Sequence, residues 1–286
     1  ISQEHILVGN GAAELIRSLM ENLEGKVGII RPSFEEYGNR LNAGQRVVFE
    51  PAKPDFSYTV EDIITFFEDK DIQNLVLINP DNPSGNYIES GKLYKLFDWT
   101  KQKGIRLIYD ESFSDFACEE ERSMLKETVL KQYPQVYIVK SLSKSYGIPG
   151  LRLGILASGD EEMISFLKKD VAIWNINSFA EYFLQIYEKY AKEYEAATRK
   201  LAAEREWFMA SLDKLTGVRV IPSQANYVMV ELQGDLSATE LTKCLLTEHE
   251  ILVKDLSSKT GGEYLRIAVR NREDNQALIK ALESLL

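Results

Sequence analysis

The chain contains 286 residues, of which 44% are hydrophobic and 27% are charged, a composition typical of globular proteins rather than of fibres or disordered chains. Its 44 acidic and 34 basic residues give a net charge of −10, which argues against a nucleic-acid groove or an anionic membrane surface as its partner. Only His5, His249, Cys118 and Cys244 are available as histidine and cysteine ligands, so a histidine-rich metal cage, a Cys-x-x-Cys zinc site and a disulfide scaffold are excluded.

The first half of the chain alternates short β-branched runs with amphipathic stretches. This pattern predicts strand–helix units around a largely parallel sheet. Strands are predicted at 27–31, 46–50, 75–79, 106–110, 136–140 and 153–157, and helices at 12–22, 34–42, 60–67 and 90–103. Because ligands bind at the carboxyl ends of the strands in such folds, the residues that follow these strands are the candidates for chemistry.

Residues 160–216 contain neither glycine nor proline, which predicts a long helix that leads from a first domain to a second. Its packed face would carry Phe179, Phe183, Ile186 and Tyr190. After Gly217 a small α/β domain is predicted, with strands at 218–221, 227–231, 251–254 and 264–269 and helices at 237–248 and 275–285. We place the boundary near residue 189, so that residues 1–189 form a large domain and residues 190–286 a small one.

The sequence shows no apolar run long enough to cross a bilayer and no signal-peptide pattern at its start. Two unpaired-looking cysteines suit a reducing compartment, and the predicted location is the cytoplasm. The chain begins at Ile1 rather than at methionine, directly before a strand-like run at residues 6–8. We therefore expect an N-terminal segment to be missing upstream.

Two glycine- or proline-containing turns follow predicted strands. Gly9-Asn10-Gly11-Ala12-Ala13-Glu14 is either a simple turn and helix start or an anion site on free N–H groups at the helix N-terminus. Glu14 stands where a dinucleotide fingerprint has its third glycine, which disfavours a nicotinamide-binding enzyme. Asn79-Pro80-Asp81-Asn82-Pro83-Ser84-Gly85 is either a structural turn or a rigid loop in which Asn82 offers its amide to a ligand.

Two further strand ends carry charged side chains. Asp110 ends a predicted buried strand and is either a helix cap or a carboxylate that needs a partner cation, such as a protonated ring nitrogen of a cofactor. The loop from Ser141 to Arg152 combines hydroxyls, Lys144 and an arginine between runs that look buried. Hydroxyls and arginine suit a phosphate, and an amine beside them suits a carbonyl.

In this order and spacing, the four segments resemble the pyridoxal-phosphate-dependent class I/II aminotransferases, most closely the branch of histidinol-phosphate aminotransferase and threonine-phosphate decarboxylase. The resemblance runs from about Glu4 to Leu285. It implies the α/β fold-type I architecture, in which a large domain with a mostly parallel sheet between helices carries the cofactor. A smaller C-terminal α/β domain closes over the substrate.

The resemblance also implies roles for individual residues around pyridoxal 5′-phosphate. Lys144 matches the lysine that forms a Schiff base with the cofactor and acts as general base, and Asp110 matches the aspartate that keeps the pyridine nitrogen protonated. Asn82 matches the amide at the phenolic oxygen, and Phe34 the aromatic side chain on the ring face. The cofactor phosphate is assigned to the backbone of Ala12 and Ala13 and to the side chains of Ser141, Ser143 and Arg152.

For the substrate, Arg266 matches the arginine that pairs with the α-carboxylate, and Asn82 lies on the same side. Lys254 stands where relatives with phosphorylated substrates often carry arginine. A lysine attracts an anion but cannot donate the bidentate pair of hydrogen bonds that a guanidinium donates. Phe113 replaces a usual tyrosine and removes one hydrogen bond to the cofactor oxygen. The segment from Trp174 to Phe179 looks like a decarboxylase-type segment near the substrate channel, with core packing as its alternative.

The predicted function is an aminotransferase that moves an amino group between an amino acid, phosphorylated or not, and a 2-keto acid. The nearest alternative is a decarboxylase of a phosphorylated amino acid, which uses the same cofactor. A second alternative is a non-catalytic cofactor-binding domain of a longer protein. The resemblance implies a homodimer, and no metal, nucleic acid or membrane partner is expected.

Overall fold

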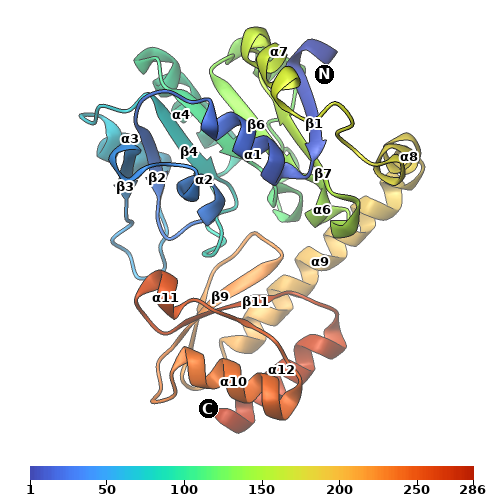
Figure 1. The fold of residues 1–286 in the computed structure, drawn as a ribbon. Coiled ribbons are helices and arrows are strands. Elements are labelled where there is room, and N and C mark those ends of the chain that lie inside the picture. Colours follow the sequence, from blue (N-terminus) through green and yellow to red (C-terminus); the bar gives the residue numbers. More distant parts are fainter.

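The computed structural model describes residues 1–286 and has two lobes joined by a long helix (Figure 1). The upper lobe is built on a seven-stranded sheet with the order β1-β7-β6-β5-β4-β2-β3. Its strands are β1 (Ile6–Asn10), β2 (Val27–Ile30), β3 (Arg46–Phe49), β4 (Asn74–Ile78), β5 (Arg106–Asp110), β6 (Val136–Ser141) and β7 (Leu153–Ala157). The strands from β3 to β6 are parallel, whereas β7 runs antiparallel to both β6 and β1. The predicted mostly parallel sheet is therefore confirmed.

Helices cover both faces of this sheet, which is why a central strand such as β4 is buried along its whole length. One face packs against α1 (Ala12–Glu21), α2 (Glu35–Asn39) and α7 (Glu161–Asp170). The other packs against α3 (Val60–Phe67), α4 (Ser90–Lys103) and α5 (Glu127–Gln132). The carboxyl ends of β5 and β6, which carry Asp110 and Ser141, lie at the end of the sheet that faces the lower lobe.

The lower lobe is a four-stranded antiparallel sheet with the order β10-β11-β9-β8. Its elements are β8 (Val218–Ile221), β9 (Tyr227–Leu232), α10 (Ala238–His249), β10 (Lys254–Asp255), α11 (Ser257–Thr260), β11 (Tyr264–Ala268) and α12 (Arg272–Leu285). This confirms the smaller C-terminal α/β unit. The predicted strand at 251–254 is wrong in extent, because Glu250 turns left-handed (φ 57°) after α10 and pairing with β11 begins only at Lys254. The boundary near residue 189 stays a prediction.

The predicted long helix at 160–216 is wrong, because the segment forms three helices: α7, α8 (Ser178–Ile186) and α9 (Ala191–Leu212). Val171 is extended and ends α7, and the side chain of Asn177 starts α8 by accepting a hydrogen bond from the Ala180 N–H at 3.0 Å. The predicted packed face is also wrong in part. Phe179 is 78% exposed and Tyr190 is 56% exposed.

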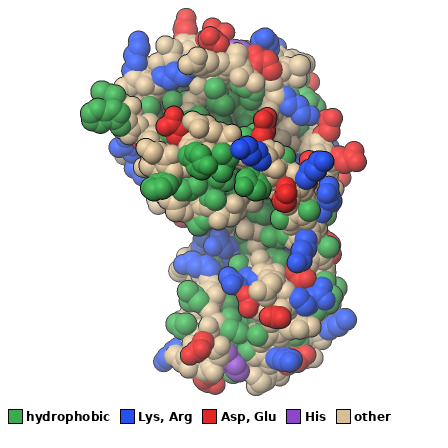
Figure 2. All heavy atoms as spheres, turned by 90° about the vertical axis from the view of Figure 1, so that its right-hand side faces the viewer, with side chains coloured by type: hydrophobic (Ala, Val, Ile, Leu, Met, Phe, Trp, Pro, Cys, Tyr) green, Lys and Arg blue, Asp and Glu red, His purple; other side chains and the backbone are tan.

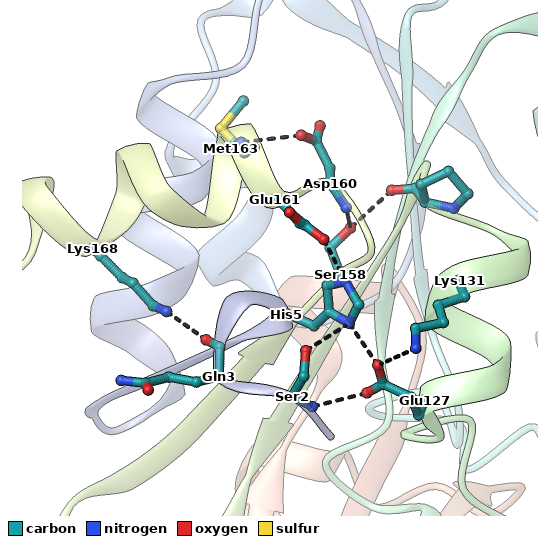
Figure 3. Close-up of polar contacts among 11 residues, drawn as sticks. Ser2, Gln3, His5, Glu127, Lys131, Ser158, Asp160, Glu161, Met163 and Lys168 are labelled. Atoms are coloured by element: carbon teal, nitrogen blue, oxygen red, sulfur yellow. Dashed lines mark hydrogen bonds and ion pairs between the residues drawn. The ribbon is translucent and has the colours of Figure 1, made fainter.

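His5 ties the first residues to two helices of the upper lobe (Figure 3). Its ring nitrogens lie 3.1 Å from Glu127 on α5 and 3.2 Å from Glu161 on α7, and the ring is buried. The same Glu127 accepts a hydrogen bond from the Ser2 N–H at 2.9 Å. These contacts give His5 a structural role, and it lines neither pocket described below.

Cys118 and Cys244 are both free. No helix combines the length and apolar character that crossing a bilayer requires.

Arg205 joins the two lobes from the middle of α9. Its side chain is fully buried, and its Nη1 donates hydrogen bonds to the carbonyl oxygens of Phe116 at 2.7 Å and Ala225 at 3.1 Å. Phe116 belongs to the upper lobe and Ala225 precedes β9. Beside them, Phe113 packs edge-to-face on Tyr227 at 5.1 Å. The buried guanidinium thus holds together two backbone segments, one next to Phe113 and the other next to Tyr227.

Replacing this guanidinium leaves buried carbonyl groups without donors. We expect Arg205→Met to lower the free energy of unfolding by about 3 kcal/mol. Urea denaturation followed by circular dichroism measures this loss. Arg199→Met is the matched control, since Arg199 lies on the same helix but is 70% exposed in its side chain, and we expect a change below about 0.5 kcal/mol. Equal losses in both variants would contradict the role of Arg205.

Candidate active site

Two adjoining pockets lie where the upper sheet faces the lower lobe. The first is lined by residues at or after the ends of β1, β2, β4, β5 and β6. Every residue predicted to bind the cofactor lines it: Ala12, Ala13, Phe34, Asn82, Asp110, Ser141, Ser143, Lys144 and Arg152. Residues that lie far apart in the sequence are thus brought together around one space.

The second pocket adjoins the first and includes residues of the lower lobe. The predicted substrate-binding residues Arg266, Lys254 and Asn82 all line it. Four residues line both pockets: Phe34, Asn82, Phe113 and Lys144. The shared wall therefore contains the amine of Lys144, which can reach ligands in either pocket.

Asp110 supplies a buried carboxylate at the end of β5 and is only 4% exposed. One oxygen accepts a hydrogen bond from the Tyr37 hydroxyl at 2.8 Å, and the other accepts one from the Ser112 N–H at 2.9 Å. Burial raises the pKa of this carboxyl, while these hydrogen bonds and the charge of Lys144 oppose the rise. A cation placed in the pocket would stabilise the charged form.

A second group of residues in the first pocket suits an anion. Helix α1 begins at Ala12, and its first N–H groups have no partner within the helix. Gly11 precedes it with φ 85°, and a Cβ there would lie 2.3 Å from Nη2 of Arg152. Arg152 has a left-handed φ of 56°, a strained backbone value, and its guanidinium lies beside Gly11 at this helix end. The buried Ser143 hydroxyl has no hydrogen-bond partner.

Lys144 lies on the short helix α6 (Leu142–Ser145), directly after β6. Its Nζ is 5.9 Å from the centroid of the Phe113 ring. Burial lowers the pKa of Lys144, and the positive charges of Arg266 and Arg152 lower it further, against the effect of Asp110. A larger fraction of the amine is therefore neutral at a given pH, which is the form that attacks a carbonyl.

Arg266 reaches the shared wall from β11. Its Nη1 donates a hydrogen bond to Oδ1 of Asn82 at 2.6 Å, and its guanidinium lies 5.1 Å from the centroid of the Tyr227 ring. The amide oxygen of Asn82 is therefore occupied, and its Nδ2 group remains as a donor. The Tyr227 hydroxyl donates to the carbonyl oxygen of Asp81 at 2.7 Å, which holds the Asn82 loop against the lower lobe.

Several residues at the site were not predicted from the sequence. Tyr37 could have been noticed because it follows Phe34 by one helical turn. Tyr227 and Lys259 gave no signal, since one stands in a strand and the other in a polar loop. Lys140 is buried behind the site, 2.8 Å from Asp115 and 3.6 Å from Glu111. The Trp174 segment does not line either pocket, and Trp174 is 95% exposed.

Comparison with known proteins places the chain in a family. The family described as aminotransferase class I and II matches residues 1–282. The chain belongs to the class I and II aminotransferases. It is 38% identical to an L-serine phosphate decarboxylase of Sulfurospirillum multivorans, over 100% of this chain and 75% of that protein. It is 30% identical to a threonine-phosphate decarboxylase of Salmonella typhimurium, over 98% of this chain and 77% of that protein.

Among solved structures, the histidinol-phosphate aminotransferase of Clostridium acetobutylicum is similar, with a TM-score of 0.87 and 27% identity over 98% of this chain and 83% of that one. The predicted resemblance and the fold-type I architecture are therefore confirmed. Class I and II aminotransferases are enzymes that depend on pyridoxal phosphate.

The residues of the first pocket fit this cofactor. The unpartnered Ser143 hydroxyl, Arg152 and the start of α1 can hold its phosphate. Asp110 offers a carboxylate for the ring nitrogen, and the amine of Lys144 lines the same pocket. The individual assignments remain proposals from the sequence, supported by this convergence.

The assignment of the covalent lysine can be tested by trapping. Reduction with borohydride in the presence of pyridoxal phosphate fixes the cofactor on the amine that binds it, and peptide mass spectrometry locates the adduct. We expect the adduct on Lys144 and its complete loss in Lys144→Ala. Lys280→Ala, which removes an exposed lysine of α12, should keep it. An adduct that persists in Lys144→Ala would refute the assignment.

Proposed function

We propose that the chain is a pyridoxal-phosphate-dependent decarboxylase of a phosphorylated L-amino acid such as O-phospho-L-serine. The observation that carries the proposal is the second pocket, which joins Arg266 and Lys254 to the amine of Lys144. Lys254 and Arg266 are direct neighbours in the register of β10 and β11. A substrate with two anionic groups matches this arrangement, and the similar decarboxylases are named for such substrates.

In this proposal each side chain has a defined task. When bound, the cofactor supplies an electron sink for negative charge at the substrate Cα. Arg266 binds and orients the α-carboxylate through its two-nitrogen fork. Asn82, hydrogen-bonded to Arg266, keeps the guanidinium in position. The bond from Cα to the carboxylate breaks, carbon dioxide leaves, and Lys144 delivers a proton to Cα in its place.

Transamination, the first prediction from the sequence, is supported less well, although the family includes aminotransferases. It would use the same residues, with Lys144 removing the Cα proton instead of replacing the carboxylate. The two reactions differ in which bond of Cα is broken, so their products distinguish them. A non-catalytic role is not favoured, because the chain belongs to a family of enzymes.

We also propose a homodimer. In support, large apolar side chains are exposed on α8 and the loop before it: Ile173, Trp174, Phe179 and Tyr182. Figure 2, which faces this side, shows hydrophobic side chains grouped on the upper lobe. A cytoplasmic location remains a prediction.

The reaction is tested by product analysis. We expect the protein loaded with cofactor to release carbon dioxide from carboxyl-labelled O-phospho-L-serine or O-phospho-L-threonine without any added keto acid. The amine product should appear in equal amount, and Lys144→Ala should release none. Formation of a keto acid that depends on an added amino acceptor, with no carbon dioxide, would establish transamination instead.

A further inference from the structure

The second pocket holds more positive charge than an α-amino acid needs. Lys144, Lys254, Lys259 and Arg266 line it, against one carboxylate, that of Glu35. In the proposed function, Lys144 serves the cofactor and Arg266 the α-carboxylate. Two lysines remain, and a phosphate monoester carries close to two negative charges at neutral pH.

Lys259 lies on α11, a single-turn helix at the top of the lower lobe in Figure 1. Its Nζ lies 3.5 Å from Oε1 of Glu35, a residue of α2 in the upper lobe. Glu35 directly follows Phe34 and also lies 3.5 Å from Nη2 of Arg31. The contact therefore crosses from one lobe to the other at the mouth of the pocket, and Glu35 shares its charge between two cations.

The surroundings leave the ammonium of Lys259 incompletely neutralised. Its side chain is 22% exposed. Burial lowers the pKa of Lys259, with a further contribution from Arg266, while Glu35 and Asp81 oppose the change. Asp81 is itself buried, and its two carboxylate oxygens accept hydrogen bonds from the hydroxyls of Ser84 and Ser33 at 2.8 and 2.9 Å. Neither oxygen is therefore exposed toward the pocket. An anion that enters the pocket would gain from this charge.

We propose that Lys259 binds the phosphate group of the substrate side chain and selects for it, exchanging its contact with Glu35 for one with the phosphate. The inference rests on the substrate class in the proposed function. Lys254, which is exposed and lines the same pocket, supplies a second cation from β10. The alternative is a purely structural ion pair between the lobes, which would act on stability and on all ligands alike.

Binding of two ligands that differ only in the phosphate separates these possibilities. Because the holoenzyme is expected to convert O-phospho-L-serine, apparent affinity is measured from the Michaelis constant of O-phospho-L-serine and from the inhibition constant of L-serine against that reaction. We expect Lys259→Met to weaken binding of O-phospho-L-serine by about 10- to 100-fold, the loss of one charge-assisted hydrogen bond. Binding of L-serine should change by less than about twofold. Lys259→Arg should retain most of the affinity for O-phospho-L-serine, and Lys243→Met, on the exposed face of α10, should bind both ligands as the wild type does.

Glu35→Gln provides a second, opposite test. It removes the resting partner of Lys259, so O-phospho-L-serine should bind at least as tightly as to the wild type. A structural ion pair predicts that Lys259→Met and Glu35→Gln weaken both ligands in the same way, and that result would overturn the proposal. Unchanged affinity of Lys259→Met for O-phospho-L-serine would overturn it as well.

The outcome also separates this inference from the proposed function. A wild type that releases carbon dioxide from O-phospho-L-serine, together with a Lys259→Met variant of unchanged affinity, rejects Lys259 and keeps the function. A wild type that prefers O-phospho-L-serine through Lys259 but converts it without carbon dioxide release keeps the phosphate site and rejects decarboxylation.

Discussion

The carboxylate of Asp110 is buried at the end of β5, and a buried charge is unfavourable unless positive charge or hydrogen bonds compensate it. Tyr37 and the Ser112 N–H provide hydrogen bonds but no charge. Lys140, the buried cation behind the site, is already matched by Asp115 and Glu111. Burial raises the pKa of Asp110, the charge of Lys144 lowers it, and a protonated pyridine ring bound in the pocket would supply further positive charge.

The second pocket, unlike the first, is built from both lobes. Asp110, Lys144 and the start of α1 come from the upper lobe, whereas Arg266 and Tyr227 come from the lower sheet. Three of the contacts between the lobes lie beside the pockets: Arg266 to Asn82, Tyr227 to the Asp81 backbone, and the Arg205 side chain to two carbonyl groups. Each of them holds a residue of the pocket or its immediate neighbour. Part of the junction between the lobes thus lies at the active site, and other contacts, such as those of Arg219 and Tyr264 with the Pro54 carbonyl oxygen, lie outside it.

Much of this arrangement could be predicted from the sequence. Asp110 and Ser141 follow apolar runs that only a buried strand explains, and the carboxyl ends of parallel strands meet at one edge. Contacts made by side chains across the fold could not be predicted in this way. The hydrogen bond from Tyr37 to Asp110, the buried Arg205 and the position of Lys259 all depend on tertiary packing. The break at residues 171–177 was missed because it contains no glycine or proline, and Asn177 acts there as a cap that helix propensity does not reveal.

We propose that Asp110 holds a positive ring nitrogen in the first pocket. Nitrogen-15 NMR of the protein loaded with ring-labelled pyridoxal phosphate observes that nitrogen directly. We expect the chemical shift of a protonated pyridine at neutral pH, persisting to higher pH than in the free cofactor, because the buried carboxylate stabilises the proton. Asp110→Ala should shift the signal to that of the neutral ring. A neutral ring nitrogen in the wild-type protein at neutral pH would contradict the account.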